Sequence, residues 1–453
     1  MGHFKTFHRH TMLILMVVFL LAVTATGTVF RPWWFDEVLT ITNFAMLDSP
    51  WRIYNSYIIP NNQIVHTICL HFMTGSELLF GYFRFFPLIC ALLTVGLLYR
   101  SFRKECGTVP LTAALGAWMF SAPFFIYSTA LRGYMLAALL VTLALLCGRK
   151  FAVSGKFSAL AGNFAATFLA VGVMPSALAG IGAAQLFILP YFGKRFYRKR
   201  DFYLLAAVPA AAFALFYAPI FPQLQQAAAL REGWHSHGAA LLAVLVALAA
   251  VFNLLIPAAL YHDFRKKWSL RRSCFLLIWL LPLGMFAFPV APFPRVWWVI
   301  FPVLVLTLAR SLKSAGTVKK WWFIPVVLAL LTNIPMVKST LSPLCSCAGQ
   351  DDFIAPYFMQ DDFVPYLAAE AAQTTPHHAV YASFDADPWS LLPYMHEKLL
   401  SDPPGGKLKQ IPDHTVIILK YGENPASITE RFGGSIRPLQ TTGRYALYLW
   451  RKI

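Results

Sequence analysis

The chain has 453 residues and a formal net charge of +18, and 58% of its residues are hydrophobic whereas only 13% are charged. Soluble domains carry roughly 45–50% apolar and about 25% charged residues, so the composition excludes a disordered chain, a fibrous repeat and an ordinary soluble enzyme. Together with a mean hydropathy of +0.58, it predicts a polytopic α-helical membrane protein.

Basic residues stand in short runs between apolar stretches rather than in one patch. These runs lie at 100–104, 149–156, 194–200, 265–272 and 310–320. By the positive-inside rule, clusters of Lys and Arg beside apolar spans indicate cytoplasmic loops. The net charge therefore predicts a membrane orientation, and no nucleic-acid partner is expected.

The first apolar run, residues 11–30, follows a short basic start and is long enough to span a bilayer. A cleaved signal peptide is the alternative, but Ala25-Thr-Gly27 is a poor cleavage site, so an uncleaved first helix is favoured. Further apolar runs lie near 83–99, 109–128, 134–148, 157–192, 202–220, 239–261, 273–309 and 321–337.

The runs 157–192 and 273–309 are too long for one crossing, and basic residues flank both ends of each. Each run must therefore cross an even number of times. Pro175 predicts the turn in the first run, because proline lacks the N–H that a helix interior needs. Pro292, Pro294 and Arg295 interrupt the second run. This gives about 11 transmembrane helices.

The charge distribution supports one orientation. Segments predicted to lie inside carry 22 Lys and Arg against three acids, whereas the outer loops before residue 340 carry seven against five. We therefore predict a multi-pass protein of the cytoplasmic (inner) membrane. Its N-terminus is expected in the cytoplasm and its C-terminal segment outside.

Residues 340–453 hold 12 of the 20 acids and no run long enough to span a membrane. Hydrophobic periodicity predicts helices at Asp361–Gln373 and Pro388–Leu400, and strands at His378–Phe384, Thr415–Lys420 and Arg444–Trp450. The expected organisation is a transmembrane module over 1–339 and a small extracytoplasmic α/β domain over 340–453.

The first outer loop, about residues 31–82, holds half of the acids found before residue 340: Asp36, Glu37, Asp48 and Glu77. Asp36 and Glu37 directly follow the first span, beside aromatic residues. One interpretation is that they are simply solvated. The other is a carboxylate at the membrane–water boundary, where desolvation raises a carboxylate's pKa and suits it to act as a general base. The rest of the loop resembles amphipathic helices that lie in the interface.

Three arginines occupy outer positions that the topology disfavours. Arg132 lies at the tip between two spans, Arg295 lies in a similar tip, and Arg84 lies at the outer start of the second span. A snorkelling or lipid-headgroup arginine is one explanation. A bound phosphate is the other, because guanidinium is its bidentate partner. No strong metal motif is present, and no metal ligand is assigned.

Several of these segments resemble GT-C glycosyltransferases, which are integral-membrane enzymes that use lipid-phosphate sugars. The closest groups are relatives of dolichyl-phosphate-mannose protein mannosyltransferases and of the lipid A aminoarabinose transferase. Asp36-Glu37 resembles the family's acidic motif, and Ala130-Leu-Arg132-Gly-Tyr134 resembles its Ala-Arg-x-Tyr segment. Pro294-Arg295 resembles its Arg-Tyr segment, with Val296 where Tyr is usual.

Asn61–Leu88 is similar to the family's stretch between the acidic motif and the second span. The family often has a His-Pro pair there, and here Asn62-Gln63 takes its place. The similarity extends over roughly residues 10–310.

The resemblance implies that a monosaccharide is transferred, with inversion, from a polyprenyl-phosphate donor to a hydroxyl acceptor. The acceptor would belong to an envelope glycan, a lipid or a protein, and membrane lipid is a further expected partner. Asp36 or Glu37 would be the catalytic base. Arg132, Arg295 and Arg84 would hold the lipid phosphate, and Glu77 and Tyr134 would help bind substrate. No cofactor is certain, and a divalent metal (Mg, Mn or Zn) is left open because relatives differ in needing one.

Two other classes of function fit the spans. A transporter or flippase of lipid-linked sugars would also need phosphate-seeking arginines, but it predicts charged residues near the bilayer midplane. A non-catalytic assembly subunit is the third class, and it predicts that the Asp36 loop is dispensable.

Overall fold

The computed structural model describes residues 2–25, 37, 40–56, 62–74, 82–193, 196, 199–229, 236–265, 269–290, 292–313, 321–332, 371–373, 375–383, 399–401, 408–420, 423–442 and 445–452. The chain divides into two compact units, one helical and one that contains a β-sheet. Glu37 and Thr40 group with the sheet unit. The predicted boundary at residue 339 lies outside the described residues.

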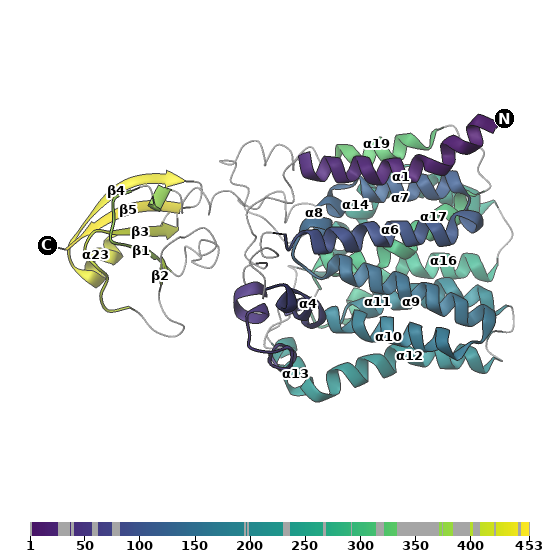
Figure 1. Ribbon diagram of the computed structural model, residues 1–453, viewed down its shortest axis with the longest axis horizontal. Helices are drawn as coiled ribbons and strands as arrows, with labels where there is room; N and C mark the ends of the chain where they lie inside the picture. Colours follow the sequence, from purple (N-terminus) through teal and green to yellow (C-terminus); the bar gives the residue numbers. More distant parts are fainter. Residues whose placement is uncertain are drawn as a thin grey trace. The chain divides into compact units, whose positions relative to one another are not determined.

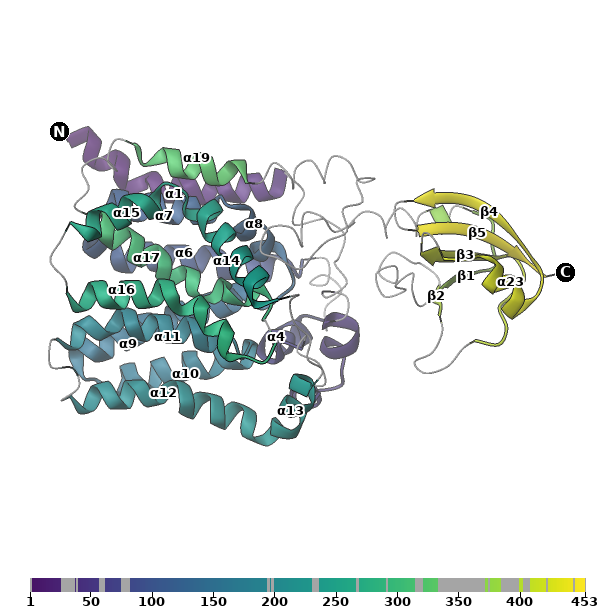
Figure 2. The same cartoon turned by 180° about the vertical axis from the view of Figure 1, so that it is seen from behind.

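The helical unit is a bundle whose long helices run side by side, with α4 and α13 at the end away from the N-terminus (Figures 1 and 2). The main helices are α1 (Gly2–Ala25), α6 (Phe85–Cys106), α7 (Thr108–Met119), α8 (Ala122–Thr129), α9 (Tyr134–Ser154), α10 (Phe157–Val173), α11 (Ala177–Ile188), α12 (Arg200–Tyr217), α13 (Phe221–Ala229), α14 (His237–Phe252), α15 (Leu255–Phe264), α16 (Leu270–Leu280), α17 (Phe301–Leu312) and α19 (Phe323–Leu331). Shorter elements are η1 (Ile41–Ala45), α3 (Pro50–Tyr54), α4 (Ile64–Thr74), η2 (Leu189–Phe192), η4 (Ala218–Ile220), η5 (Leu281–Ala287) and η6 (Pro294–Ile300).

Each apolar run of the sequence contains one or more of these helices, so the polytopic helical fold is confirmed. By length and composition five helices of the described chain can cross a membrane, or up to seven if each bent pair is one span. Shorter apolar helices are present at Thr11–Thr24, Phe157–Val173 and Ala177–Phe192. The count of 11 spans stays a prediction.

Local sequence explains where the spans bend or turn. α7 and α8 meet at 67°, and Pro123 in the first turn of α8 lacks the N–H that would continue α7. α14 and α15 meet at 91°, where Asn253 has a φ of +31° and its amide donates to the Pro325 carbonyl at 3.0 Å. The turn predicted at Pro175 separates α10 from α11.

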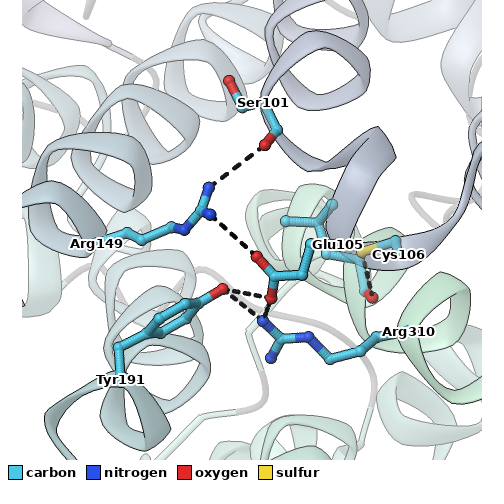
Figure 3. A network of polar contacts seen from close by, with 7 residues as sticks. Ser101, Glu105, Cys106, Arg149, Tyr191 and Arg310 are labelled. Atoms are coloured by element: carbon cyan, nitrogen blue, oxygen red, sulfur yellow. Dashed lines mark hydrogen bonds and ion pairs between the residues drawn. The ribbon is translucent and has the colours of Figure 1, made fainter. Parts of the chain in front are cut away.

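Charged residues near the ends of α6, α9 and α17 meet in one network of polar contacts (Figure 3). The carboxylate of Glu105, near the end of α6, pairs with Arg310 of α17 and with Arg149 of α9, whose Nη2 lies 3.1 Å from Oε2. The Tyr191 hydroxyl donates to the same carboxylate and accepts from Arg310 Nη2 at 2.5 Å. Three runs predicted to be cytoplasmic therefore share one end of the bundle.

The sheet unit contains β1 (Ala379–Ala382), β2 (Leu399–Leu400), β3 (Thr415–Lys420), β4 (Ser435–Thr442), β5 (Tyr445–Arg451) and α23 (Ala426–Phe432). The strand order is β2-β1-β3-β5-β4, in which β1 is parallel to β2 and β3, and β5 is antiparallel to β3 and β4. One apolar cluster includes Val380 and Val416, and another includes Tyr381 and Trp450. The small α/β domain predicted from the sequence is thus confirmed.

The predicted strands at 378–384, 415–420 and 444–450 correspond to β1, β3 and β5. The predicted helix Pro388–Leu400 is wrong at its described end, because Leu399–Leu400 forms β2. Pairing with Val380 and Tyr381 buries Leu399, and this tertiary contact outweighs the local helical pattern. Of the predicted helix Asp361–Gln373, the described residues 371–373 are helical.

Gly180 of α11 provides a test of the packing that holds η6. α11 packs against η6 and α9, and a Cβ on Gly180 would lie 2.6 Å from the Val299 carbonyl oxygen and 2.9 Å from Val141 Cγ2. Because a backbone oxygen cannot rotate away, we expect Gly180→Ala to lower the free energy of unfolding by about 1–3 kcal/mol. The measurement is the thermal unfolding midpoint in detergent.

The matched control is Gly182→Ala on the same helix, where a Cβ meets nothing within 4 Å. This substitution should leave the midpoint unchanged or raise it slightly, because alanine favours helix over glycine by roughly 0.5–1 kcal/mol. Equal midpoints for the two variants would contradict the close approach of α11 and η6.

Candidate functional site

The structure places four of the seven predicted site residues in the helical unit, and all four are buried. Arg84 and Arg132 are each 3% exposed, Tyr134 is 3% exposed and Arg295 is 8% exposed. Glu37 is fully buried and groups with the other unit. Asp36 and Glu77 lie outside the described residues.

Arg132 lies in the tight turn between α8 and α9. Its backbone N–H donates to the Ala130 carbonyl at 2.7 Å, and the next N–H, that of Gly133, donates to the side-chain oxygen of Gln63. A Cβ on Gly133 would lie 2.3 Å from Val173 Cγ1. Glycine therefore lets α4 and the end of α10 close on the turn that carries Arg132.

α4 connects this turn to the start of α6. His66 of α4 is fully buried, and its ring centroid lies 5.8 Å from that of Phe86. Phe86 is two residues after Arg84, which stands at the N-cap of α6. α4 and the residue before it therefore contact both segments, the start of α6 through His66 and the Arg132 turn through Gln63.

Asn62 fixes the start of α4. Its amide nitrogen donates to the carbonyls of Ile53 and Ser56, each at 3.2 Å, and its side-chain oxygen accepts from the Thr67 hydroxyl at 3.0 Å. Asn62 is 1% exposed, so these bonds satisfy a buried amide that would otherwise be costly. They tie α4 to α3 and hold Gln63 in place.

A row of aromatic rings connects the Arg132 turn to η6, which carries Arg295. The Tyr134 and Tyr127 centroids are 4.7 Å apart, and the Tyr127 and Trp298 centroids are 4.9 Å apart. The Arg295 guanidinium carbon lies 4.7 Å from the Phe293 ring centroid. Arg132 and Arg295 therefore belong to segments that pack together, although more than 160 residues separate them in the sequence.

The three buried arginines lie at the end of the bundle opposite to the Glu105 network. α6 begins after Arg84 and contains Glu105 in its last turn, and its 22 residues span about 33 Å. Guanidinium groups stay charged in proteins and present a planar fork to oxyanions. The structure thus places all three of the predicted arginines at the same end of the bundle.

Among the described residues, no group of three or more His, Cys, Asp or Glu could hold a metal ion. Asp36 and Glu77, which the sequence analysis singled out, are not among these residues. A divalent metal thus stays an open question for the outer loop.

Sequence reasoning missed the residues that support the arginines. From the sequence, Asn62 and Gln63 are only a departure from the family's His-Pro pair. Tyr127 and Trp298 are two of many aromatic residues in the apolar runs. The one available signal was an Asn-Gln pair directly before an apolar helix, but nothing in the sequence shows that Gln63 reaches a turn 70 residues away.

We expect Gln63→Leu to reduce activity more than stability. Leucine leaves the buried Gly133 N–H without its acceptor, at a cost of about 1–3 kcal/mol, and frees α4 from the Arg132 turn. The measurement is the sugar transfer that the GT-C resemblance implies, expressed per folded molecule, with folding followed by thermal unfolding in detergent.

Gln185→Leu is the matched control, because Gln185 Nε2 donates to the Leu205 carbonyl at 2.8 Å between α11 and α12. It should lose comparable stability and keep its activity per folded molecule. Similar activity losses in both variants would show that Gln63 acts only through general stability.

Neither a protein-family model nor a curated protein matches the chain. Solved structures, in contrast, are similar to the chain. The chain is similar to the crystal structure of ArnT from Cupriavidus metallidurans bound to undecaprenyl phosphate, with 12% sequence identity, a TM-score of 0.57, and coverage of 96% of this chain and 97% of that chain. The apo structure of the same ArnT matches with 13% identity, a TM-score of 0.55 and the same coverage.

These alignments span both units of the chain, and at this identity they show the fold. The likeness that the short motifs indicated is confirmed for the fold: the chain has the fold of the solved ArnT structures.

Proposed function

We propose that the protein is a glycosyltransferase that moves a monosaccharide from a polyprenyl-phosphate donor to a hydroxyl acceptor on the outer face of the cytoplasmic membrane. One observation carries the proposal. Arg84, Arg132 and Arg295 come from three separate segments, are buried at one end of the bundle, and are tied together through α4 and the Tyr134–Tyr127–Trp298 row. The crystallised ArnT with the same fold holds undecaprenyl phosphate.

The orientation follows from the charges at the two ends. The end with Glu105 contains the basic runs that indicate the cytoplasm. In the proposed orientation, the end with Arg84, Arg132 and Arg295 therefore faces outward. A lipid donor keeps its tail in the bilayer and its phosphate at this outer rim. A reporter enzyme that is active only in the cytoplasm, fused after the last residue, should be silent in this orientation.

In the proposed reaction, the acceptor hydroxyl attacks the anomeric carbon and the bond from that carbon to the phosphate oxygen breaks, with inversion. The hydroxyl proton passes to the carboxylate of Asp36, or of Glu37 beside it. The lipid phosphate leaves with an additional negative charge, which the three guanidinium groups stabilise more strongly than they stabilise the donor. Tyr134 and Glu77 are assigned to sugar or acceptor hydroxyls. Activity with and without a chelator decides whether a divalent metal takes part.

The same structure gives less support to the alternative function, a transporter or flippase of lipid-linked sugars. It predicts ionisable groups near the bilayer midplane. In the described helices α6, α9, α12, α16 and α17 the Lys, Arg, Asp and Glu residues lie in the turns near one helix end. This distribution favours a transfer reaction at the end of the bundle over a transport path for lipid-linked sugars through its middle.

Asp36→Asn should leave the protein folded and inserted but nearly inactive. The amide matches the carboxylate in size but cannot accept the acceptor's proton, and loss of a general base typically costs ~10²–10⁴-fold in rate. The assay is sugar transfer by purified protein with a saturating lipid donor. Full turnover of this variant, together with loss of turnover in Glu37→Gln, would assign the base to Glu37 instead.

Arg132→Ala and Arg295→Ala should each weaken donor use by roughly 10–150-fold, because a charge-assisted contact contributes ~1.5–3 kcal/mol. Lysine at either position should rescue only partly, since it keeps the charge but loses the planar fork. The measurement is a titration of lipid donor at fixed acceptor.

Arg52→Ala is the matched control at the same end of the bundle, because Arg52 is exposed and forms a surface ion pair with Asp48. Surface pairs of this kind contribute little, so its donor titration should match that of the unsubstituted protein. An unchanged donor response in both Arg132→Ala and Arg295→Ala would remove the phosphate role from these residues.

A further inference from the structure

A second group of arginines surrounds a cavity at the opposite, Glu105 end of the bundle. The cavity has a volume of ≈ 260 Å³ and lies among α11, α15, α16 and α17. Its polar lining includes Asp263, Ser269, Arg271, Arg272, Thr307, Arg310 and Ser311. No part of the proposed transfer reaction uses these residues, which lie at the far end of the spans from Arg84.

The described residues around this cavity include more guanidinium groups than carboxylates. Arg310 lines the cavity and shares the Glu105 carboxylate with Arg149 (Figure 3). Among the described residues that line the cavity or belong to the Glu105 network, there are four guanidinium groups, with Arg271 and Arg272, and two carboxylates, Glu105 and Asp263. A lining this rich in guanidinium groups at the edge of an apolar bundle has a positive potential that favours a bound anion.

The burial of these groups strengthens the argument. Arg272 is 9% exposed, and the Arg310 side chain is 16% exposed. The Nε–H of Arg310 is buried and has no hydrogen-bond acceptor among the described residues, while the Phe187 ring lies 4.0 Å from its guanidinium carbon. Asp263 is already engaged by the Ser311 hydroxyl at 2.6 Å. The one carboxylate in the lining is therefore shared with a hydroxyl.

The start of α16 adds to the positive potential. Ser269 is its N-cap, and Arg271 and Arg272 stand in its first turn, where the helix macrodipole also favours an anion. Further along α16, Leu277 and Leu280 are about half exposed, as expected for a lipid-facing surface.

We propose that this cavity binds a phosphate group at the cytoplasmic rim, supplied either by an anionic phospholipid headgroup or by a free phosphate ion. A water molecule occupies about 30 Å³ of liquid volume, so the cavity has room for a phosphate and a few waters. Drug-sized ligands and whole cofactors take pockets of roughly 300–1,000 Å³, so the phosphate itself is the group that fits inside.

The test uses the full-length protein in detergent, with phosphatidylglycerol and inorganic phosphate as probes and uncharged-headgroup phosphatidylcholine for comparison. Binding is followed by the thermal unfolding midpoint over a concentration series. We expect Arg271→Gln/Arg272→Gln to weaken binding of the effective probe by at least about tenfold. Arg100→Gln, which removes an exposed charge of α6 at the same end, should bind like the unsubstituted protein.

The two sources of phosphate give different results. Stabilisation by phosphatidylglycerol that inorganic phosphate does not compete away assigns the site to a lipid headgroup, and stabilisation by inorganic phosphate alone assigns it to the free ion. Identical responses of the double variant and the unsubstituted protein to every probe would overturn the proposal.

Hydrogen–deuterium exchange covers the case in which the double variant does not fold. In the unsubstituted protein, the effective probe should slow exchange of the amides at Leu270–Cys274, and the exposed single variant Arg271→Gln should reduce that protection. Unchanged exchange over this segment would overturn the proposal. Sugar transfer does not enter this measurement, so its outcome is independent of the proposed reaction.

Discussion

The apolar medium around the helical bundle confines charge to its two ends, and the rest of the structure depends on this constraint. A charged side chain at the bilayer centre is expensive, so the spans consist almost entirely of apolar residues. α6 shows the consequence within one helix, since Arg84 stands before its first residue and Arg103, Lys104 and Glu105 lie in its last turn. Each end of the bundle then concentrates charges that an ordinary soluble fold would spread over its surface.

The two ends use their arginines differently. At one end, the Glu105 carboxylate bridges Arg149 and Arg310 and ties α6, α9 and α17 together. At the other end, Arg84, Arg132 and Arg295 are held by backbone hydrogen bonds and ring contacts of their neighbours. In the proposed reaction, this scaffold fixes the segments whose guanidinium groups would take the lipid phosphate.

α4 is the element that joins the segments carrying Arg84 and Arg132 at one end of the bundle. It is short, and Asn62 and Gln63 at its start bond to α3 on one side and to the Arg132 turn on the other. Gly133 permits this approach because any side chain there would meet Val173. The fold shared with ArnT at 12% identity fits this view: such a bundle needs apolar spans of the right length and a few close contacts, and many sequences satisfy both.

The sequence by itself determined the elements whose cause is local. Apolar runs and their basic flanks predicted the helices, Pro175 predicted the turn between α10 and α11, and alternation predicted β1, β3 and β5. It also singled out Arg84, Arg132 and Arg295, because an arginine on the outer side of a membrane protein is exceptional. Only the tertiary structure decided what surrounds these residues. Gln63 meets Gly133 across 70 positions and Tyr127 meets Trp298 across 171, and such contacts follow from how whole helices pack. Tertiary contacts can also overrule a local pattern. The pattern around Leu399–Leu400 indicated a helix, but these residues form a strand because they pair with β1.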